Sequence, residues 1–257
     1  MNTLNASEPV PTPVVAGTMS APGRPGGPVE DPVRGFIHDV RTPLGAVRGF
    51  AEVILDDPDL DAATRTEFLQ TIIRETDRAI ELVRQLGDLG RIRREALPMA
   101  PVGILPAVVE PVLHEMQEQA MGEGVVLVGE IFACPVTLVC APEWIGTLIR
   151  EVVAMSIRWT PAGGRVWVGV SIRGSILRIE SADEGVAVTE AQRQRLLEPY
   201  FRERLAPRQG GSAGLGLVLA SEIARVHGGS VGVHHGEQCG VILSVELPLD
   251  EMVDGSR

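Results

Sequence analysis

The sequence predicts an α+β protein in which a helical hairpin precedes a separate domain of mixed helices and strands. Between residues 33 and 54, apolar residues recur at alternating spacings of four and three, as on a helix that packs against other helices. A second helical pattern follows after a short polar segment. Beyond residue 100, short β-branched segments bounded by Gly or Pro alternate with helical patterns, which is typical of a layered α/β domain.

The N-terminal segment shows no sustained hydrophobic period. Six Pro and four Gly fall within its first 30 positions. Such a segment cannot bury enough apolar surface to offset the entropy lost on ordering it. We therefore expect residues 1–32 to form a disordered tail, and residues 250–257 to form a second, polar tail.

The hairpin is predicted over residues 33–95. Its first helix carries the 4–3 seam Val33, Ile37, Val40, Leu44, Val47, Ala51 and Ile54. Asp59 or Asp61 is the expected N-cap of the second helix, which runs to about Leu89. Its residues expected to face inward are Leu69, Ile72, Ala79, Val83 and Leu86. Two such helices leave apolar surface uncovered, so we expect two chains to combine their hairpins into a four-helix bundle, giving a homodimer.

The second domain is predicted over residues 100–249. Six segments are short, β-branched and bounded by turn residues, and we expect them to form strands: 124–132, 136–140, 165–172, 175–182, 230–235 and 240–248. Helical patterns occupy 106–121, 142–158, 189–198 and 214–227.

Composition and charge exclude several classes of function. A net charge of −11 leaves no basic stripe to displace counterions from phosphates, so we expect no nucleic-acid partner. All 23 positively charged side chains are Arg, which excludes lysine chemistry. No apolar run reaches the length of about 18 residues that a membrane-spanning helix needs, so we expect no membrane segment.

The cysteines and histidines also limit the possible functions. Cys134, Cys140 and Cys239 form no CxxC pair, and no apolar targeting segment opens the chain, so we expect a cytoplasmic protein with three thiols. His227, His234, His235 and Cys239 invite a metal hypothesis. Adjacent residues on a strand point to opposite faces, however, and we expect these to be satisfied surface residues that hold no metal.

A candidate reactive site lies in the first helix of the hairpin. His38 and Thr42 are spaced i and i+4 and share one helix face, with Asp39 beside them. A neighbouring carboxylate can fix the imidazole tautomer and leave the other ring nitrogen as a nucleophile. Pro43 lacks an N–H and crowds the preceding turn, so we expect the helix to bend here. The pattern fits phosphoryl transfer to a ring nitrogen, with the Thr hydroxyl orienting a hydrolytic water.

The string FIHDVRTPLGAVRGFAEVIL resembles the H-box of the sensor histidine kinases of two-component signalling. The resemblance covers the whole hairpin and implies a dimerisation and phosphoacceptor domain. It implies that His38 is the phosphorylated residue, that Asp39 is its acid/base partner and that Thr42 is the phosphatase residue. The implied partner is the receiver domain of a response regulator.

The second domain resembles the ATP-binding domain of the same family, an α/β sandwich of the Bergerat (GHKL-type) fold. GGSAGLGLVLASEIARVHGG resembles its second glycine box, with Gly214 and Gly216 beside a helix N-terminus. IESADEGVAV resembles the first glycine box, which implies that Asp183 accepts a hydrogen bond from adenine, with Gly185 nearby. LLEPYFRER resembles the phenylalanine box and offers Arg202 to a phosphate.

The sequence departs from the family in the segment EVVAMSIRWTP, residues 151–161. Met155 stands where the family has its magnesium-binding Asn, and a thioether is a poor ligand for Mg²⁺. Ala187 and Val241 replace a glycine and a threonine of the other boxes. Glu151 could lend a magnesium ligand or be a solvated helix residue, and Arg158 is a further candidate contact to the nucleotide. We expect binding of ATP and Mg²⁺ to be weakened.

Three functions stay open at this point. The chain is an autokinase that phosphorylates His38 from ATP, an ATP-independent histidine phosphotransferase or phosphatase, or a pseudokinase scaffold without chemistry. The intact H-box disfavours the scaffold, and the three departures disfavour the autokinase. We therefore predict a two-component signalling protein that carries a phosphoryl group on His38 and exchanges it with a receiver aspartate.

Overall fold

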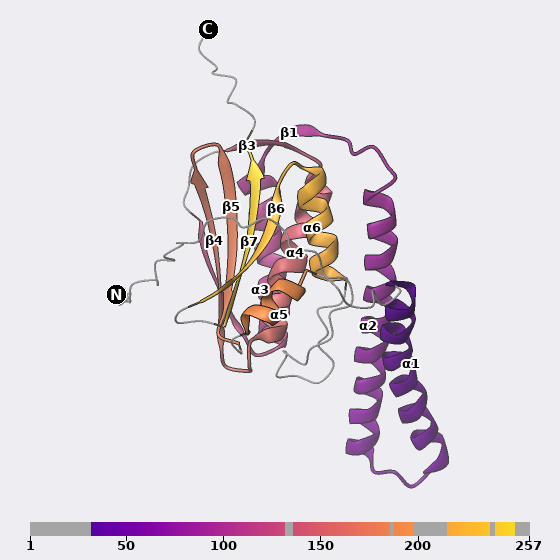
Figure 1. Cartoon of the computed structure of the whole chain (residues 1–257). Coiled ribbons are helices and arrows are strands. Elements are labelled where there is room, and N and C mark those ends of the chain that lie inside the picture. The colour runs from indigo at the N-terminus through magenta and orange to yellow at the C-terminus, as the bar shows by residue number, and fades with distance from the viewer. Residues whose placement is uncertain (1–31, 132–135, 186–187, 198–214, 237–239, 250–257) are drawn as a thin grey trace, which may run out of the picture.

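The computed structural model describes residues 32–131, 136–185, 188–197, 215–236 and 240–249. Two antiparallel helices, α1 (Pro32–Asp56) and α2 (Ala62–Ile92), form the predicted hairpin (Figure 1). Of the two candidate caps, Asp61 is the N-cap of α2, and its Oδ1 accepts hydrogen bonds from the N–H groups of Ala63 and Thr64 at 3.0 Å. This cap fixes the point at which the chain turns back.

The second domain contains the predicted strands and helices. In chain order its elements are β1 (Ala100–Gly103), a π-helical turn (Leu105–Val109), α3 (Glu110–Gly122), β2 (Val126–Ile131), β3 (Thr137–Cys140), α4 (Pro142–Trp159), β4 (Arg165–Arg173), β5 (Ile176–Asp183), α5 (Glu190–Arg195), α6 (Gly216–Val226), β6 (Ser230–His235) and β7 (Val241–Pro248). All six predicted strands are present. Strand β1, which pairs antiparallel with β3, was not predicted because four residues with a Pro among them form no recognisable run.

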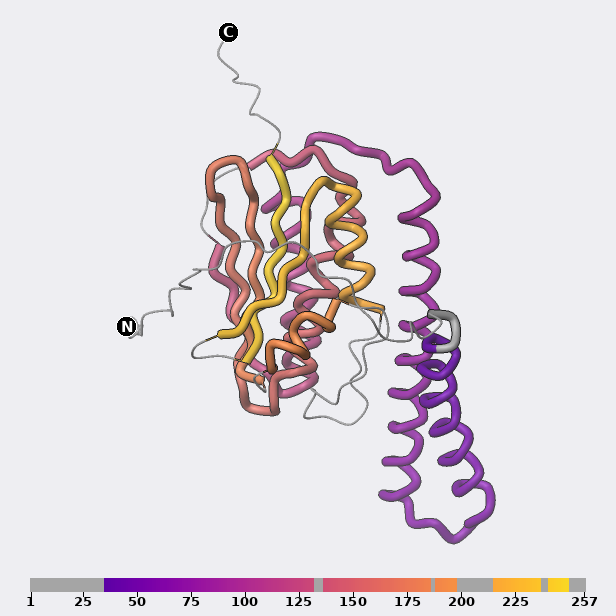
Figure 2. The backbone as a smooth tube through the Cα atoms, in the orientation of Figure 1, coloured from indigo at the N-terminus to yellow at the C-terminus, as the bar shows by residue number. Residues whose placement is uncertain are grey.

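The larger sheet has the strand order β2-β4-β5-β7-β6. Only the β2–β4 pair is parallel, and the other three pairs are antiparallel. Helices α3, α4 and α6 cover one face of this sheet, and α2 runs along the far side of that helical layer (Figures 1 and 2). The core between sheet and helices is built from fully buried aliphatic side chains such as Leu148, Ile149, Val166 and Leu243. This two-layer arrangement is the predicted α/β sandwich.

The lower part of the hairpin buries little of its apolar seam within one chain. Ile37, which we expected to be buried, is half exposed, as is Leu44 on the same helix. On α2, the expected inward residues Leu69, Val83 and Leu86 are exposed, together with Ile73 and Ile80. We expected these side chains to be buried between two hairpins, and within one chain they stay exposed because one hairpin offers each helix few neighbours.

The upper part of α2 packs against the second domain instead. Leu89 and Ile92 are buried and belong to the same apolar cluster as the helices of that domain. Arg93 of α2 pairs with Glu222 of α6, with 3.2 Å between Nε and Oε1. Hairpin and second domain therefore share one core, and α2 crosses from one into the other.

The histidines of the second domain have structural partners. His227 is buried rather than on the surface as expected: its Nε2 accepts a hydrogen bond from the N–H of Ala141 at 3.2 Å, and its Nδ1 lies 2.8 Å from the carbonyl oxygen of Ile223. An Nε2 that accepts and an Nδ1 that faces a carbonyl oxygen fit the tautomer with its proton on Nδ1, and burial lowers the pKa of His227. Among the described residues, no group of three His, Cys, Asp or Glu side chains could hold a metal ion.

A helix that crosses a lipid bilayer needs about 20 mostly apolar residues. Within the described ranges, no helix combines sufficient length with sufficient apolar character to span a membrane.

Candidate phosphoacceptor and nucleotide sites

His38 lies on α1, and its side chain is 62% exposed. Its Nδ1 is 3.6 Å from Oδ1 of Asp39, whose own side chain is only 9% exposed. The Thr42 hydroxyl donates a hydrogen bond to the carbonyl oxygen of His38 at 3.1 Å. An accessible imidazole therefore stands beside a largely buried carboxylate, one turn before a hydroxyl on the same helix.

Pro43 lies inside α1, which continues through it from Pro32 to Asp56. Because Pro has no N–H, the carbonyl of Asp39 loses its usual partner in the helix. Pro43 is buried, so its ring packs against the hairpin and holds this turn in place. The turn of α1 that carries His38 is thus anchored by the packing of Pro43, the residue with the lowest helix propensity.

Asp183 ends strand β5 and is completely buried. Its Oδ1 accepts hydrogen bonds from the N–H groups of Gly185 at 2.8 Å and Val241 at 3.3 Å. Its Oδ2 is buried with no hydrogen-bond partner among the described residues. Burial raises the pKa of Asp183 to about 6, against the lowering effect of the two backbone donors. An unused buried acceptor of this kind fits the exocyclic amine of adenine, as the resemblance implied.

Gly185 is required by close packing around Asp183. A Cβ at Gly185 would lie 2.6 Å from Oδ1 of Asp183 and 2.6 Å from the carbonyl oxygen of Trp159. A Cβ at Gly240 would come within 2.5 Å of the same carboxylate oxygen. Both glycines therefore let the backbone enclose the carboxylate.

Helix α4 leads away from this end of the site. Ser156 of α4 is hydrogen bonded to Ser181 of β5, with 2.8 Å between the two hydroxyl oxygens, both of which are buried. Trp159 lies beside Asp183, and Glu151 lies eight residues earlier on α4. At 1.5 Å per helical residue, α4 advances about 12 Å between Glu151 and Trp159, so these two residues mark opposite ends of the site.

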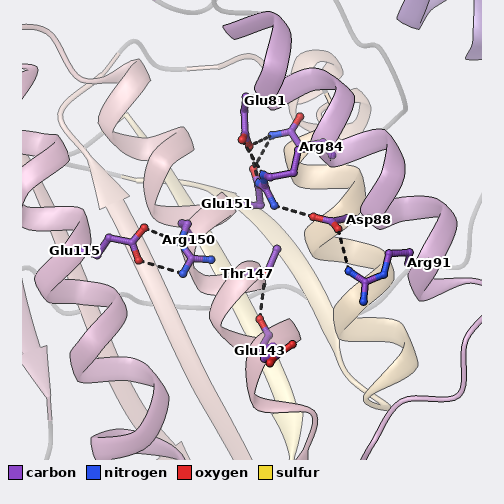
Figure 3. Close-up of polar contacts among 10 residues, drawn as sticks. Glu81, Arg84, Asp88, Arg91, Glu115, Glu143, Thr147, Arg150 and Glu151 are labelled. Carbon is purple, nitrogen blue, oxygen red and sulfur yellow. Dashed lines mark hydrogen bonds and ion pairs between the residues drawn. The ribbon is translucent and has the colours of Figure 1, made fainter. Parts of the chain in front are cut away.

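Glu151 is buried and bound by the hairpin, not solvated. Its Oε1 accepts a hydrogen bond from Nη2 of Arg84 at 2.7 Å, and its Oε2 accepts one from Nε2 of Gln85 at 2.9 Å. Figure 3 shows Arg84 reaching from α2 toward this carboxylate. Burial raises the pKa of Glu151, as does the charge of Glu81, while Arg158 and Arg84 lower it.

Gly216 begins α6 directly against this contact. A Cβ there would lie 2.6 Å from Oε2 of Glu151 and 3.4 Å from Nε2 of Gln85. The glycine does allow a close approach, as expected, but in this structure the groups that approach are two side chains of the protein. One of them comes from the hairpin.

Met155 is fully buried in the core. Nη2 of Arg158 lies 3.9 Å from its sulfur, and Nε of Arg158 is buried with no hydrogen-bond partner among the described residues. A buried thioether beside a guanidinium does not fit Mg²⁺, which needs hard oxygen ligands. Since Glu151 already binds two side chains, the described residues fit the adenine end of a nucleotide and do not fit the metal.

Five of the residues singled out in the sequence lie outside the described residues: Cys134, Ala187, Arg202, Gly214 and Cys239. Arg84 and Gln85 were missed. They belong to a helix whose local pattern indicates only helix packing, and Glu151 follows 66 or 67 residues later. Ser156 and Ser181 were missed for the same reason.

Comparison with known proteins finds a matching family for the hairpin and another for the second domain. The family model of the His Kinase A phospho-acceptor domain matches residues 33–95. The family model described as histidine kinase-, DNA gyrase B- and HSP90-like ATPase matches residues 140–251. The chain carries the two domains of a two-component histidine kinase, in that order, and it belongs to that family of enzymes.

Among curated proteins, the chain is similar to the sensor protein kinase PmrB of Pseudomonas aeruginosa, with 32% identity over 216 residues that cover 82% of this chain and 44% of PmrB. It is also similar to the signal transduction histidine-protein kinase BaeS of Escherichia coli, with 28% identity covering 83% of this chain and 45% of BaeS. The chain thus spans about half the length of the curated relatives it matches.

Solved structures share the fold. Histidine kinase ThkA in complex with the response regulator protein TrrA gives a TM-score of 0.68 at 16% identity, covering 85% of this chain and 61% of that one. The Acinetobacter baumannii histidine kinase AdeS gives 0.64 at 18% identity, covering 83% and 98%. Full-length ShkA in complex with AMPPNP gives 0.57 at 25% identity, covering 85% and 46%.

Asp183 allows a test that combines stability with binding. Because burial raises the pKa of this carboxyl from 3.8 to about 6, the stability of the fold falls as the pH rises from about 4 to about 6, and the ionised form destabilises it fully above that. Asp183→Asn should raise the free energy of unfolding at pH 7.5 by about 1 to 3 kcal/mol. The gain should shrink as the pH falls through 6, because the wild-type carboxyl then takes up a proton.

Chemical denaturation at pH 7.5 and pH 5 would measure this difference, and titration with ATP should show a loss of affinity in the same variant. Ser181→Ala, which changes a different buried polar group of β5, is the control and should be destabilising at both pH values. A destabilised Asp183→Asn at pH 7.5 would contradict the assignment.

Proposed function

We propose that this chain carries a phosphoryl group on His38 and exchanges it with an aspartate in the receiver domain of a response regulator. The single observation that carries the proposal is the exposed imidazole of His38 beside the carboxylate of Asp39, within a hairpin that matches the phospho-acceptor family. An accessible ring can meet a phosphoryl donor without any rearrangement of the hairpin.

The roles of the three residues follow from their positions. A ring nitrogen of His38 attacks phosphorus and forms the N–P bond, while the bond from phosphorus to the donor oxygen breaks. The Asp39 carboxylate, 3.6 Å from Nδ1, stabilises the positive charge that the ring gains. The hydroxyl of Thr42 could orient a water for hydrolysis of the phosphorylated receiver once its hydrogen bond to the His38 carbonyl opens.

ATP is the proposed nucleotide ligand of the second domain, with the adenine amine on Oδ2 of Asp183 and the phosphates toward Glu151, Arg158 and Gly216. The unused buried acceptor supports this placement. The buried thioether of Met155 and the bound state of Glu151 favour the second candidate, in which His38 exchanges phosphoryl groups with receivers without drawing on ATP.

The proposed partners are a second copy of this chain and a response regulator. The exposed apolar residues of the hairpin support the homodimer, since a four-helix bundle would cover them. The complex of ThkA with its response regulator is a solved example of such a partner for a chain of the same fold. A cytoplasmic location remains the prediction from the cysteines, of which Cys140 is free and buried.

The roles of His38 and Thr42 should separate in mutants. His38→Gln should abolish uptake of labelled phosphate from a phosphorylated receiver domain and from ATP, because no nucleophilic nitrogen remains. Thr42→Ala should keep at least half of the uptake and slow dephosphorylation of the receiver by about tenfold or more. Acid-labile label on the chain and loss of label from the receiver are the two measurements.

Thr42→Ser is the matched control, because it keeps the hydroxyl and should retain dephosphorylation. If Thr42→Ala lost uptake and dephosphorylation equally, the division of roles would be wrong.

The dimer can be tested on the full chain. Ile80→Glu places a charge on the exposed stripe of α2, where a single chain tolerates it but a four-helix bundle would bury it. We expect light scattering to show a dimer for the wild type and a folded monomer for Ile80→Glu at micromolar concentration. Gln70→Glu, an exposed position on the same helix, should stay dimeric, and a monomeric wild type would contradict the proposal.

A further inference from the structure

The contact between hairpin and second domain centres on three side chains: Arg84 and Gln85 of α2, and Glu151 of α4. We call this set the latch. Both carboxylate oxygens of Glu151 are used, one by each hairpin residue, at 2.7 and 2.9 Å. Glu151 and Gln85 are both 3% exposed. Arg84 is 38% exposed, so the latch joins a partly exposed guanidinium to a buried amide and a buried carboxylate.

Neighbouring carboxylates hold the guanidinium of Arg84 in position. Its Nε and Nη2 bind the two oxygens of Glu81 at 2.8 and 2.6 Å, and its Nη1 binds Asp88 at 2.7 Å. These bonds raise the pKa of Arg84, so it stays charged. Figure 3 shows the guanidinium between these groups and Glu151. A long side chain fixed at three points loses little further freedom when it binds Glu151.

The latch lies at the phosphate end of the proposed nucleotide site. Gln85 comes so close to the start of α6 that a Cβ at Gly216 would be 3.4 Å from its Nε2. The first turn of α6, where free N–H groups could bind phosphate, thus faces a hairpin side chain. Asp183, beside the C-terminal end of α4, has its acceptor oxygen Oδ2 unused. One end of the site is ready for a ligand and the other is covered.

We propose that α2 and the phosphates of a nucleotide compete for one surface, so that docking of the hairpin through the latch closes the phosphate end of the site. Opening removes Arg84 and Gln85 from Glu151 and uncovers the first turn of α6. This inference rests on the proposed nucleotide site and goes beyond it, because it assigns Glu151 to an interdomain contact that turns nucleotide binding off.

The chain offers a matched control for the latch. Arg150, adjacent to Glu151 on α4, binds Glu115 of α3 through two hydrogen bonds at 3.0 and 3.1 Å. In Figure 3 this pair lies on the other side of α4 from the latch. Arg150→Gln removes the same chemistry as Arg84→Gln, but from a pair within the second domain.

The test is calorimetric titration of the full chain with ATP and with ADP, together with small-angle scattering of the same samples. Arg84→Gln should raise affinity for both nucleotides about tenfold and should increase the radius of gyration. Gln85→Ala should also raise the affinity. Arg84→Lys should give an affinity between those of Arg84→Gln and wild type, because lysine keeps the positive charge but lacks the planar guanidinium that donates several hydrogen bonds. Arg150→Gln should stay within twofold of wild type in affinity.

Unchanged or lower affinity in Arg84→Gln would overturn the latch, and so would absence of binding by every variant. Lower affinity would mean that the hairpin helps to bind the nucleotide. Phosphoryl uptake by His38 from a phosphorylated receiver, measured on the same samples, does not need the nucleotide site. If the affinities contradict the latch but uptake is retained, the latch is wrong and the proposal of phosphoryl transfer on His38 is not affected.

Discussion

The arrangement of the two domains depends on how the carboxylate of Glu151 is buried. A buried charge without partners costs several kcal/mol, so Glu151 can be buried only if other groups bind it. Its partners come from α2, and they bring the hairpin against α4 and α6. Leu89 and Ile92 then complete the contact with apolar surface. The polar contact sets the register in which the apolar residues meet.

Helix α2 serves two neighbours along its length. Its upper residues belong to the core of the second domain, whereas Ile73, Ile80 and Val83 lower down remain exposed within one chain. One apolar face of α2 is therefore uncovered within a single chain, while a different face packs against the second domain. His38 lies on the helix paired with α2, so its surroundings depend on how both faces of α2 are covered.

The two ends of the candidate nucleotide site differ in kind. At Asp183 a buried oxygen lacks a partner, which destabilises the free protein and is typical of a site kept for a ligand. At the other end, the carboxylate of Glu151 binds two side chains of the hairpin, and Met155 offers only a buried thioether. Membership of the histidine kinase family explains the unused oxygen at Asp183, and the contact with the hairpin explains why Glu151 is already bound.

The sequence alone determined the segments and the candidate phosphoacceptor, His38. The 4–3 seam, the β-branched runs and the H-box are local patterns, and local patterns report on helices, strands and motifs within some ten residues. It could not determine that Glu151 is buried, that Gln85 faces Gly216 or that Ile37 is exposed. Each of these depends on which surfaces meet, and residues 66 positions apart meet only through the packing of whole elements. Tertiary structure decided them because burial, and with it the charge and accessibility of a side chain, is a property of the assembled surfaces.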